Sequence, residues 1–412
     1  MKNFQFKMNI KNTTQTLLLC ICLFILEGNS LNAQIICGAE QINRYHHIIK
    51  NKKIAVVANQ TSVIGSSHLV DTLIALKYQI VKIFAAEHGF RGNVENGGKI
   101  KNEKDAKTGL PIVSLYGKHI KPTKQDLTGI DVVIFDIQDV GVRYYTFLTT
   151  MHYVMEACAE YGKKIVVLDR PNPNGHYIDG PVLDTTFRSM VGIHPIPLVH
   201  GMTLGELALM IKGENWLKTT KKIDLVVITV SNYTHNTVYE LPIAPSPNLP
   251  TTPSIILYPT LGLLEGTIVS MGRGTDKPFE CFGAPWLKIG SYEFTPKNIV
   301  GKAINPPYLN EKCRGLLLTD FANDYIVSYN KLYIEWLVLL YKECPDKKTF
   351  FNPFFTLLAG NKFLKKQIEE GKNANEIRLS WQVDLQKFSK QREPYLLYEY
   401  SPNKGLIKNK KS

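Results

Sequence analysis

Cysteine is scarce in this sequence. Seven cysteines occur in 412 residues, which is too few for a disulfide-stapled scaffold. Cys20 and Cys22 lie in an N-terminal apolar run, and the other five are too widely spaced to match a zinc motif. We therefore expect the five to be buried or half-buried free thiols: Cys37, Cys158, Cys281, Cys313 and Cys344.

Long apolar runs are also scarce, and the one of interest lies at the N-terminus. Three lysines precede the run Thr16–Leu26, and small residues follow it up to Ala33. The run is shorter than the roughly 20 apolar residues of a membrane-spanning helix. This pattern predicts a signal peptide over residues 1–33, cleaved near Ala33, and an exported protein in the periplasm without a stable membrane span. Lipidation at Cys20 or Cys22 and an uncleaved anchor are the less favoured alternatives.

Several catalytic motifs are absent. There is no G-x-S-x-G elbow, no P-loop, and no G-x-G-x-x-G after the first strand-like run, where Asn59-Gln60-Thr61-Ser62 stands instead. No second histidine lies at metal-ligand spacing from His88. The formal charge of +13 suits a polyanionic partner, but the lysines are scattered and no nucleic-acid motif occurs. We therefore expect no cofactor, no metal and no nucleic-acid partner.

What is present indicates a globular protein, with 44% apolar and 21% charged residues. Residues 37–245 repeat an apolar β-branched run followed by a loop and a helix-like stretch. Such runs suit strands buried on both faces, and their alternation with helices predicts a parallel sheet. We expect a Rossmann-like α/β domain with strands at Lys53–Ala58, Ile80–Ala85, Asp131–Phe135, Lys164–Leu168 and Asp224–Val230, and helices at Ser66–Leu76, Phe147–Tyr161 and Leu204–Lys212.

A Pro-rich segment, Leu241–Pro253, follows this domain and reads as a linker or rigid loop. Beyond it, residues 246–400 predict a smaller α+β domain. We expect strands at Gly315–Thr319 and Arg378–Gln382 and a helix at Leu332–Tyr341. Residues 401–412 form a basic tail.

Polar residues follow four consecutive predicted strands. Because parallel strands deliver their carboxyl ends to one rim, where ligands bind in open sheets, these groups predict a site there. The segments are Asn59–Thr61, Glu87–Gly92, Asp136–Asp139 and Asp169–Pro173.

The carboxylates on this rim suggest glycoside hydrolysis, which uses two carboxyl groups across the scissile bond. Apolar neighbours of Glu87 would raise its pKa and suit it to act as the general acid. The alternative is structural: Glu87 would interact with a helix dipole, and Asp136 and Asp169 would cap loops or pair with arginines such as Arg143 and Arg170.

Arginine and aromatic side chains fit an anionic sugar. The guanidinium fork binds carboxylates, and Arg91, Arg143, Arg170 and Arg273 all lie in Gly- or Pro-rich loops. The aromatic candidates for stacking on a sugar ring are Tyr144, Tyr145, Phe90, Phe279 and Trp286.

Several strings in this chain resemble the DUF1343 family, which includes the exo-acting β-N-acetylmuramidases called NamZ. The resemblance spans residues 37–400. It rests on Ala86–Gly92 (AEHGFRG), Asp136–Thr146 (DIQDVGVRYYT), Leu168–Pro173 (LDRPNP), Ser246–Pro250 (SPNLP), Tyr258–Thr260 with Glu265–Thr267, and Gly272–Glu280 (GRGTDKPFE).

The resemblance implies an active-site crevice between the two domains and release of N-acetylmuramic acid from the non-reducing ends of peptidoglycan fragments. It favours Glu87 as the catalytic acid, although Ala86 stands where the family often has proline. We expect Asp136 or Asp139 to be the second catalytic carboxylate, or the substrate's 2-acetamido group to be the nucleophile. Arg91 or Arg143 would hold the lactyl carboxylate. The substrate-binding candidates are Gln60, His88, Arg91, Gln138, Arg143, Tyr145, Asp169, Arg170, Asn172, Asn248, Glu265 and Arg273.

Two other functions stay open at this point. A non-catalytic peptidoglycan-binding protein would bind the sugar without turnover. An esterase or amidase acting on cell-wall fragments would depend on a serine or cysteine rather than on Glu87. The sequence leaves the stereochemical outcome and the oligomeric state undetermined.

Overall fold

The computed structural model describes residues 34–92, 103–326 and 330–401. From Ile35 onward these residues belong to one compact unit. The predicted signal peptide, and the predicted tail apart from Ser401, lie outside the described residues. None of the helices in the described ranges is both long and apolar enough to cross a bilayer.

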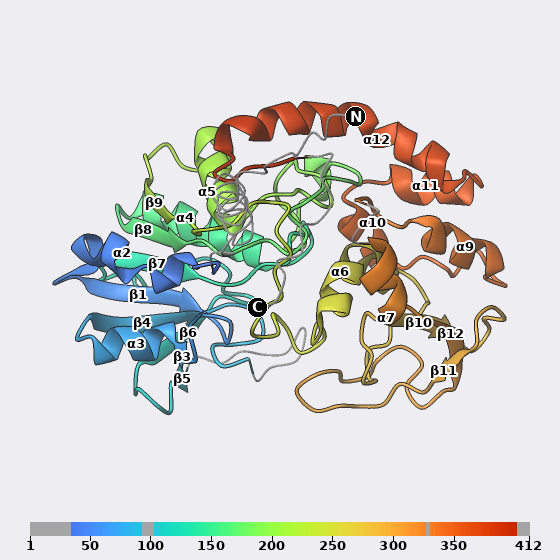
Figure 1. Cartoon of the computed structure of the whole chain (residues 1–412), viewed down its shortest axis with the longest axis horizontal. Helices are drawn as coiled ribbons and strands as arrows, with labels where there is room; N and C mark the ends of the chain where they lie inside the picture. The colour runs from blue at the N-terminus through green and yellow to red at the C-terminus, as the bar shows by residue number, and fades with distance from the viewer. Residues whose placement is uncertain (1–33, 93–102, 327–329, 402–412) are drawn as a thin grey trace, which may run out of the picture. The chain divides into compact units, whose positions relative to one another are not determined.

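A seven-stranded sheet organises the N-terminal part of the chain (Figure 1). Its order is β5-β6-β4-β1-β7-β8-β9, with β5 antiparallel at one edge and the other strands parallel. This confirms the predicted Rossmann-like parallel sheet. The strands are β1 (Lys53–Ala58), β4 (Gln79–Ala85), β5 (Glu103–Lys104), β6 (Pro111–Ser114), β7 (Val132–Asp136), β8 (Lys164–Leu168) and β9 (Asp224–Ile228).

Helices cover both faces of this sheet because its strands are apolar on both sides. In β1, Ala55 and Val57 pack with α4 (Phe147–Glu160) and α5 (Leu204–Gly213). The alternate residues pack against the opposite pair of helices, α2 (Ile42–Ile49) and α3 (Leu69–Ala75). The sheet is therefore the middle of three layers.

The C-terminal part is a smaller α+β assembly, as predicted. Its three-stranded antiparallel sheet has the order β10-β12-β11, and a short hairpin, β2 (Val63–Ile64) with β3 (Ser67–His68), belongs to the N-terminal part. Apolar residues of α6 and α10 share one hydrophobic core with those of α4 and α5. The elements are α6 (Thr252–Leu261), η3 (Gly262–Gly266), β10 (Cys281–Ala284), β11 (Tyr292–Phe294), β12 (Cys313–Leu317), α7 (Thr319–Phe321), α9 (Glu335–Glu343), α10 (Phe354–Ala359), α11 (Phe363–Glu369) and α12 (Ala374–Arg392).

One predicted strand is wrong. Residues 378–382 lie inside α12, which Asn373 begins by accepting hydrogen bonds from the amides of Asn375 and Glu376. Five of the seven buried residues of α12 recur at helical spacing over more than three turns: Ile377, Trp381, Leu385, Phe388 and Arg392. A five-residue window was too short to show this period.

The last described segment returns to the first sheet, which the sequence did not predict. Arg392 donates to the carbonyl oxygens of His200 and Gly201, at 3.2 and 2.7 Å. The Tyr398 hydroxyl donates to Asp169 Oδ2 at 2.6 Å. The end of the described chain is therefore anchored at the carboxyl end of β8.

The five cysteines of the described residues are all buried and free. This confirms the predicted thiols. Burial raises the pKa of Cys37 to about 11, so this thiol is protonated at neutral pH and is a poor nucleophile.

Candidate active site

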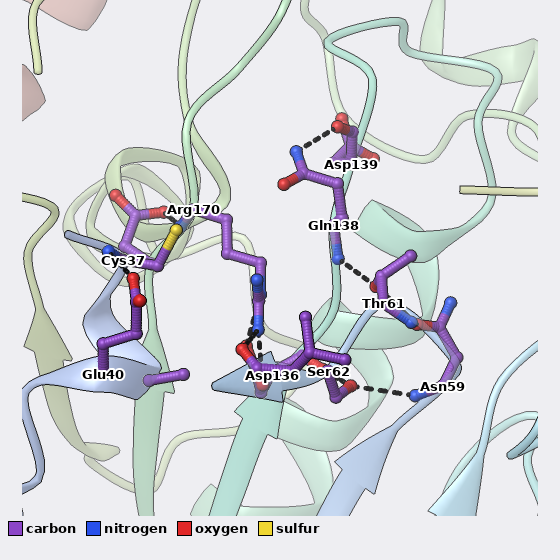
Figure 2. Close-up of polar contacts among 12 residues, drawn as sticks. Cys37, Glu40, Asn59, Thr61, Ser62, Asp136, Gln138, Asp139 and Arg170 are labelled. Atoms are coloured by element: carbon purple, nitrogen blue, oxygen red, sulfur yellow. Dashed lines mark hydrogen bonds and ion pairs between the residues drawn. The ribbon is translucent and has the colours of Figure 1, made fainter. Parts of the chain in front are cut away.

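The central crevice at the carboxyl edge of the sheet is filled by the chain's own polar groups (Figure 2). This crevice lies between β1 and β7, where the strand order reverses. The Ser62 hydroxyl accepts from the Asn59 amide at 3.0 Å and donates to the carbonyl oxygen of Asp136. The main-chain amide of Gln138 donates to Thr61 Oγ1 at 3.0 Å. These hydrogen bonds join the segments after β1 and β7 at the position where such sheets usually bind a ligand, although Asn59 Nδ2 has no hydrogen-bond partner among the described residues.

Asp136 takes part in this internal network. Its carboxylate accepts from Arg170 Nε at 2.6 Å and from Arg170 Nη2 at 2.9 Å, and both side chains are buried. The charge of Asp136 raises the pKa of Arg170. The structure thus places both residues in a buried ion pair rather than on a cavity wall, which corrects the expectation that Asp136 acts on substrate.

Asp139 and Gln138 are also buried behind the rim. Asp139 Oδ2 accepts from the Gly141 amide at 2.7 Å, and burial raises the pKa of this carboxyl to about 7. The Gln138 side chain donates to the carbonyl oxygens of Asp139 and Pro171, at 2.8 and 2.7 Å. Neither side chain lines the cavity described below.

Three further candidates hold loops together. Asp169 accepts from Thr203 Oγ1 at 2.7 Å and from the Gly205 amide at 2.8 Å, and burial raises its pKa to about 6. Asn172 Nδ2 donates to the Met202 carbonyl at 2.9 Å. Gln60 Nε2 donates at 3.1 Å to two carbonyls of the 244–245 loop. None of the three candidates lines the cavity.

Two of the arginines expected to bind substrate have other partners. The Arg143 guanidinium is buried and donates to four main-chain carbonyls at 2.6–3.0 Å. Arg91 pairs with Asp105 at 2.9 Å and with Asp71 at 3.4 Å. Arg143 therefore ties loops together, and Arg91 lies by a separate surface depression that also includes Gln60.

A cavity of about 540 Å³ lies beside the filled crevice, beyond the ends of β4 and β6 and against the C-terminal part. Its size is typical of a small-molecule site. It brings together six of the predicted site residues: Glu87, His88, Tyr145, Asn248, Glu265 and Arg273. The other lining residues are Tyr116, Gly117, Tyr144, Thr146, Met190, Val191, Ser246, Leu249, Tyr258, Phe279, Phe354 and Leu358.

A tight turn after β4 positions Glu87. The Gly89 amide donates to the Ala86 carbonyl at 3.0 Å, and His88 has a positive φ of 69°. Histidine seldom adopts this conformation, and such strained residues cluster at functional sites. Glu87 Oε2 accepts from Thr146 Oγ1 at 2.6 Å. Burial, together with the charge of Glu87 and a hydrogen bond to it, raises the pKa of Tyr116.

Glu265 lies in η3 and shares the cavity with Glu87. Burial raises the pKa of Glu265 to about 7; nearby Arg273 opposes the rise and the charge of Glu87 adds to it. The closest approach of Arg273 Nη1 to Glu265 Oε2 is 3.6 Å. The Glu265 carboxyl therefore holds its proton more tightly than an ordinary glutamate, and Glu87 lies near enough for its charge to contribute, which is an environment that suits Glu265 to act as a general acid.

Aromatic rings form one wall of the cavity. Tyr145 and Phe279 each meet the ring of Tyr258 edge to face, at centroid distances of 5.8 and 5.0 Å. The Tyr144 hydroxyl donates to the Tyr258 carbonyl at 2.7 Å, which ties the start of α4 to α6. Two of the other predicted aromatic residues, Phe90 and Trp286, lie elsewhere: Phe90 packs on His68, and Trp286 donates to Tyr308.

Sequence reasoning missed Thr146 and Tyr116, the neighbours of Glu87. Thr146 ends the long string Asp136–Thr146, so it was within reach as a site residue. Tyr116 lies two residues after β6, a short strand that begins with proline and was not predicted. Recognition of that strand would have added its loop to the rim. No cluster of three or more His, Cys, Asp or Glu side chains within the described ranges could hold a metal ion.

Comparisons with known proteins show the family of this chain. Two family models match consecutive parts of the chain: exo-beta-N-acetylmuramidase NamZ, N-terminal, over residues 54–253, and the C-terminal model over residues 256–398. The chain belongs to the NamZ family. The peptidoglycan beta-N-acetylmuramidase NamZ of Bacillus subtilis (strain 168) is 38% identical over 373 residues, covering 86% of this chain and 89% of that protein.

Two solved structures of DUF1343 family proteins are similar to this chain over about nine tenths of its length. One, from Bacteroides fragilis NCTC 9343, is 48% identical with a TM-score of 0.83 and covers 90% of this chain and 100% of its own. A second, from the same strain, is 29% identical with a TM-score of 0.74 and covers 89% of this chain and 99% of its own.

Proposed function

We propose that this protein is an exo-acting β-N-acetylmuramidase that releases N-acetylmuramic acid from the non-reducing ends of peptidoglycan fragments. Family membership over residues 54–398 supports this activity. The observation that carries it is the pair Glu87 and Glu265 in one cavity, since glycoside hydrolysis needs two carboxyl groups at the scissile bond.

The electrostatics favour a division of labour within this pair. The pKa of Glu265 is raised to about 7, so a substantial fraction of Glu265 is protonated at neutral pH and is suited to protonate the leaving oxygen. Glu87 accepts a hydrogen bond from Thr146 and lines the same cavity, and we assign it as the carboxylate partner. In that position Glu87 would activate water, attack the anomeric carbon, or orient the substrate's 2-acetamido group.

This assignment differs from the one made on sequence alone, where Glu87 was the acid and Asp136 or Asp139 its partner. Asp136 is committed to Arg170, and Asp139 is buried outside the cavity. The remaining lining groups suit a sugar: the aromatic wall offers apolar ring faces, and His88 and Asn248 offer polar atoms at its edge.

The test compares an aryl β-N-acetylmuramide with the disaccharide N-acetylmuramyl-N-acetylglucosamine. Loss of a general acid costs about 10²–10⁴-fold on a poor leaving group and much less on an activated aryl group. We therefore expect Glu265→Gln to lose turnover of the disaccharide and to retain much of its turnover of the aryl substrate. Glu87→Gln should lose turnover of both substrates. The matched control is Glu160→Gln, on α4 and paired with Lys121 at 2.7 Å, which should keep both activities.

If Glu87→Gln instead kept the aryl activity and Glu265→Gln lost both activities, Glu87 would be the acid and Glu265 its partner. Full disaccharide turnover by both variants would refute the carboxyl pair. Binding of the disaccharide by the wild type without any cleavage would replace the enzyme by a peptidoglycan-binding protein.

Export is a separate part of the proposal. It rests on the basic start, the apolar run Thr16–Leu26 and the small residues before Gln34. N-terminal sequencing of the protein from the periplasmic fraction of an expressing Gram-negative host should give a chain that starts near Gln34. An intact Met1 terminus in the cytoplasmic fraction would contradict export.

A further inference from the structure

The cavity that holds the carboxyl pair has an unusual balance of charge. Its described lining includes two carboxyl groups and a single Arg or Lys side chain, Arg273. Arg273 is largely buried, with 17% of its side chain exposed. A guanidinium in such a place needs hydrogen-bond acceptors, because a buried donor left without one is costly.

Protein groups satisfy Arg273 only in part. Its nearest carboxylate oxygen, Glu265 Oε2, is 3.6 Å from Nη1, which is beyond hydrogen-bond length. Its Nε is buried and has no hydrogen-bond partner among the described residues. Arg170, by contrast, holds Asp136 through two short hydrogen bonds. Arg273 therefore has donors to spare for a ligand.

The main chain on both sides of Arg273 is closely packed. Both flanking glycines have positive φ, 79° at Gly272 and 83° at Gly274. A Cβ on Gly272 would lie 2.5 Å from the Lys277 carbonyl oxygen, and one on Gly274 would lie 2.6 Å from the Lys297 carbonyl oxygen. The Lys297 amide also donates to Gly274 O at 2.8 Å. These contacts fix the main-chain position from which the Arg273 side chain enters the cavity.

The substrate offers a matching group. N-acetylmuramic acid differs from N-acetylglucosamine by a lactyl ether at O3, which ends in a carboxylate. That carboxylate is on the same sugar ring as the anomeric carbon, so the group that recognises it must lie within one sugar of the carboxyl pair. Arg273 lies there, and its planar fork suits a carboxylate.

We propose that Arg273 binds the lactyl carboxylate of the terminal sugar and thereby selects N-acetylmuramides over N-acetylglucosaminides. This inference rests on the proposed function for its substrate, and it assigns to Arg273 the role that sequence analysis gave to Arg91 or Arg143. Because Arg273 also lies beside Glu265, the test must separate recognition of the substrate charge from an effect on the acid.

The test varies the ligand as well as the protein. Three aryl substrates are compared: the N-acetylmuramide, its lactyl amide, which has no charge, and the N-acetylglucosaminide. A charge-assisted hydrogen bond contributes about 1.5–3 kcal/mol, or roughly 10–100-fold. We expect the wild type to prefer the charged muramide over its amide by this factor. In Arg273→Met the preference should fall to within about threefold, mainly through KM, whereas Arg273→Lys should restore part of it.

Arg91→Gln is the matched control, because Arg91 lies outside the cavity and pairs with Asp71 and Asp105. It should keep the wild-type preference. Calorimetric binding of free N-acetylmuramic acid and its lactyl amide to the same proteins measures recognition without catalysis. If the wild type binds the acid selectively through Arg273 but never cleaves a glycoside, the proposed function fails and this inference stands.

Three results would overturn the inference. The wild type could treat charged and neutral muramides alike. Arg273→Met could lower the kcat/KM for all three substrates by the same factor, which would mean that Arg273 acts through Glu265 or through the fold. Arg91→Gln could remove the preference instead, which would return the role to Arg91.

Discussion

Replacement of Arg143 by methionine tests whether this residue binds substrate, as its sequence context suggested, or holds the structure together. Its guanidinium donates to the carbonyl oxygens of Pro181, Ile196, Leu358 and Ala359. These hydrogen bonds join the 181–196 loop to the end of α10, behind Leu358 of the cavity wall. The substitution leaves the apolar stem and removes all four donors.

The magnitude follows from the carbonyls that lose a partner. Ile196 O would still accept a hydrogen bond from the Leu183 amide at 3.1 Å. The other three carbonyl oxygens accept hydrogen bonds from Arg143 and would lose them. A buried acceptor without a partner costs about 1–3 kcal/mol, so three cost roughly 3–9 kcal/mol. Relief of burying a cation offsets part of this, since burial lowers the pKa of Arg143 to about 9. We expect a net loss of about 3 kcal/mol.

Urea unfolding followed by tryptophan fluorescence measures this loss as a lower midpoint. Arg44→Met, at an exposed arginine of α2, is the control and should change stability by less than about 0.5 kcal/mol. A wild-type midpoint for Arg143→Met together with a raised KM for the muramide would refute the structural role and support direct substrate binding.

Two further predictions concern stability and the cavity loop. Burial raises the pKa of Asp139 from 3.8 to about 7, so the folded state binds this proton more tightly than the unfolded state does. The free energy of unfolding therefore falls as pH rises between these two values. We expect Asp139→Asn to have a free energy of unfolding on the order of 2 kcal/mol above that of the wild type at pH 8, and a much smaller difference at pH 5. An equal gain at both pH values, measured by urea unfolding, would contradict this reasoning. Gly274→Ala should lower the thermal midpoint and the kcat/KM for the muramide, because the added Cβ would meet the Lys297 carbonyl oxygen. The control is Gly65→Ala, at a glycine that also has positive φ but has open space around it. It should lower the free energy of unfolding by about 1 kcal/mol and leave turnover unchanged. Wild-type turnover in Gly274→Ala would show that close packing of the main chain beside Arg273 is not needed for activity.

The local sequence determined the first sheet and much of its rim. Val- and Ile-rich runs such as Lys53–Ala58 can be buried on both faces only in a layered α/β fold, and each strand end delivers polar residues to the same edge. Glu87 lies two residues beyond the end of β4, so its own strand and the turn after it bring it to that edge. The strings shared with the family pointed to the same site.

Only the tertiary structure decided which polar groups face a ligand. Asp136 and Glu87 both follow strands of one sheet, yet Asp136 meets Arg170 in the filled crevice and Glu87 meets the cavity. Glu265 and Arg273 belong to the C-terminal part and line the same cavity. The contact between Tyr144, just before α4, and Tyr258 of α6 holds the two parts together there. Burial, pairing and pKa depend on such long-range neighbours, which local sequence patterns do not contain.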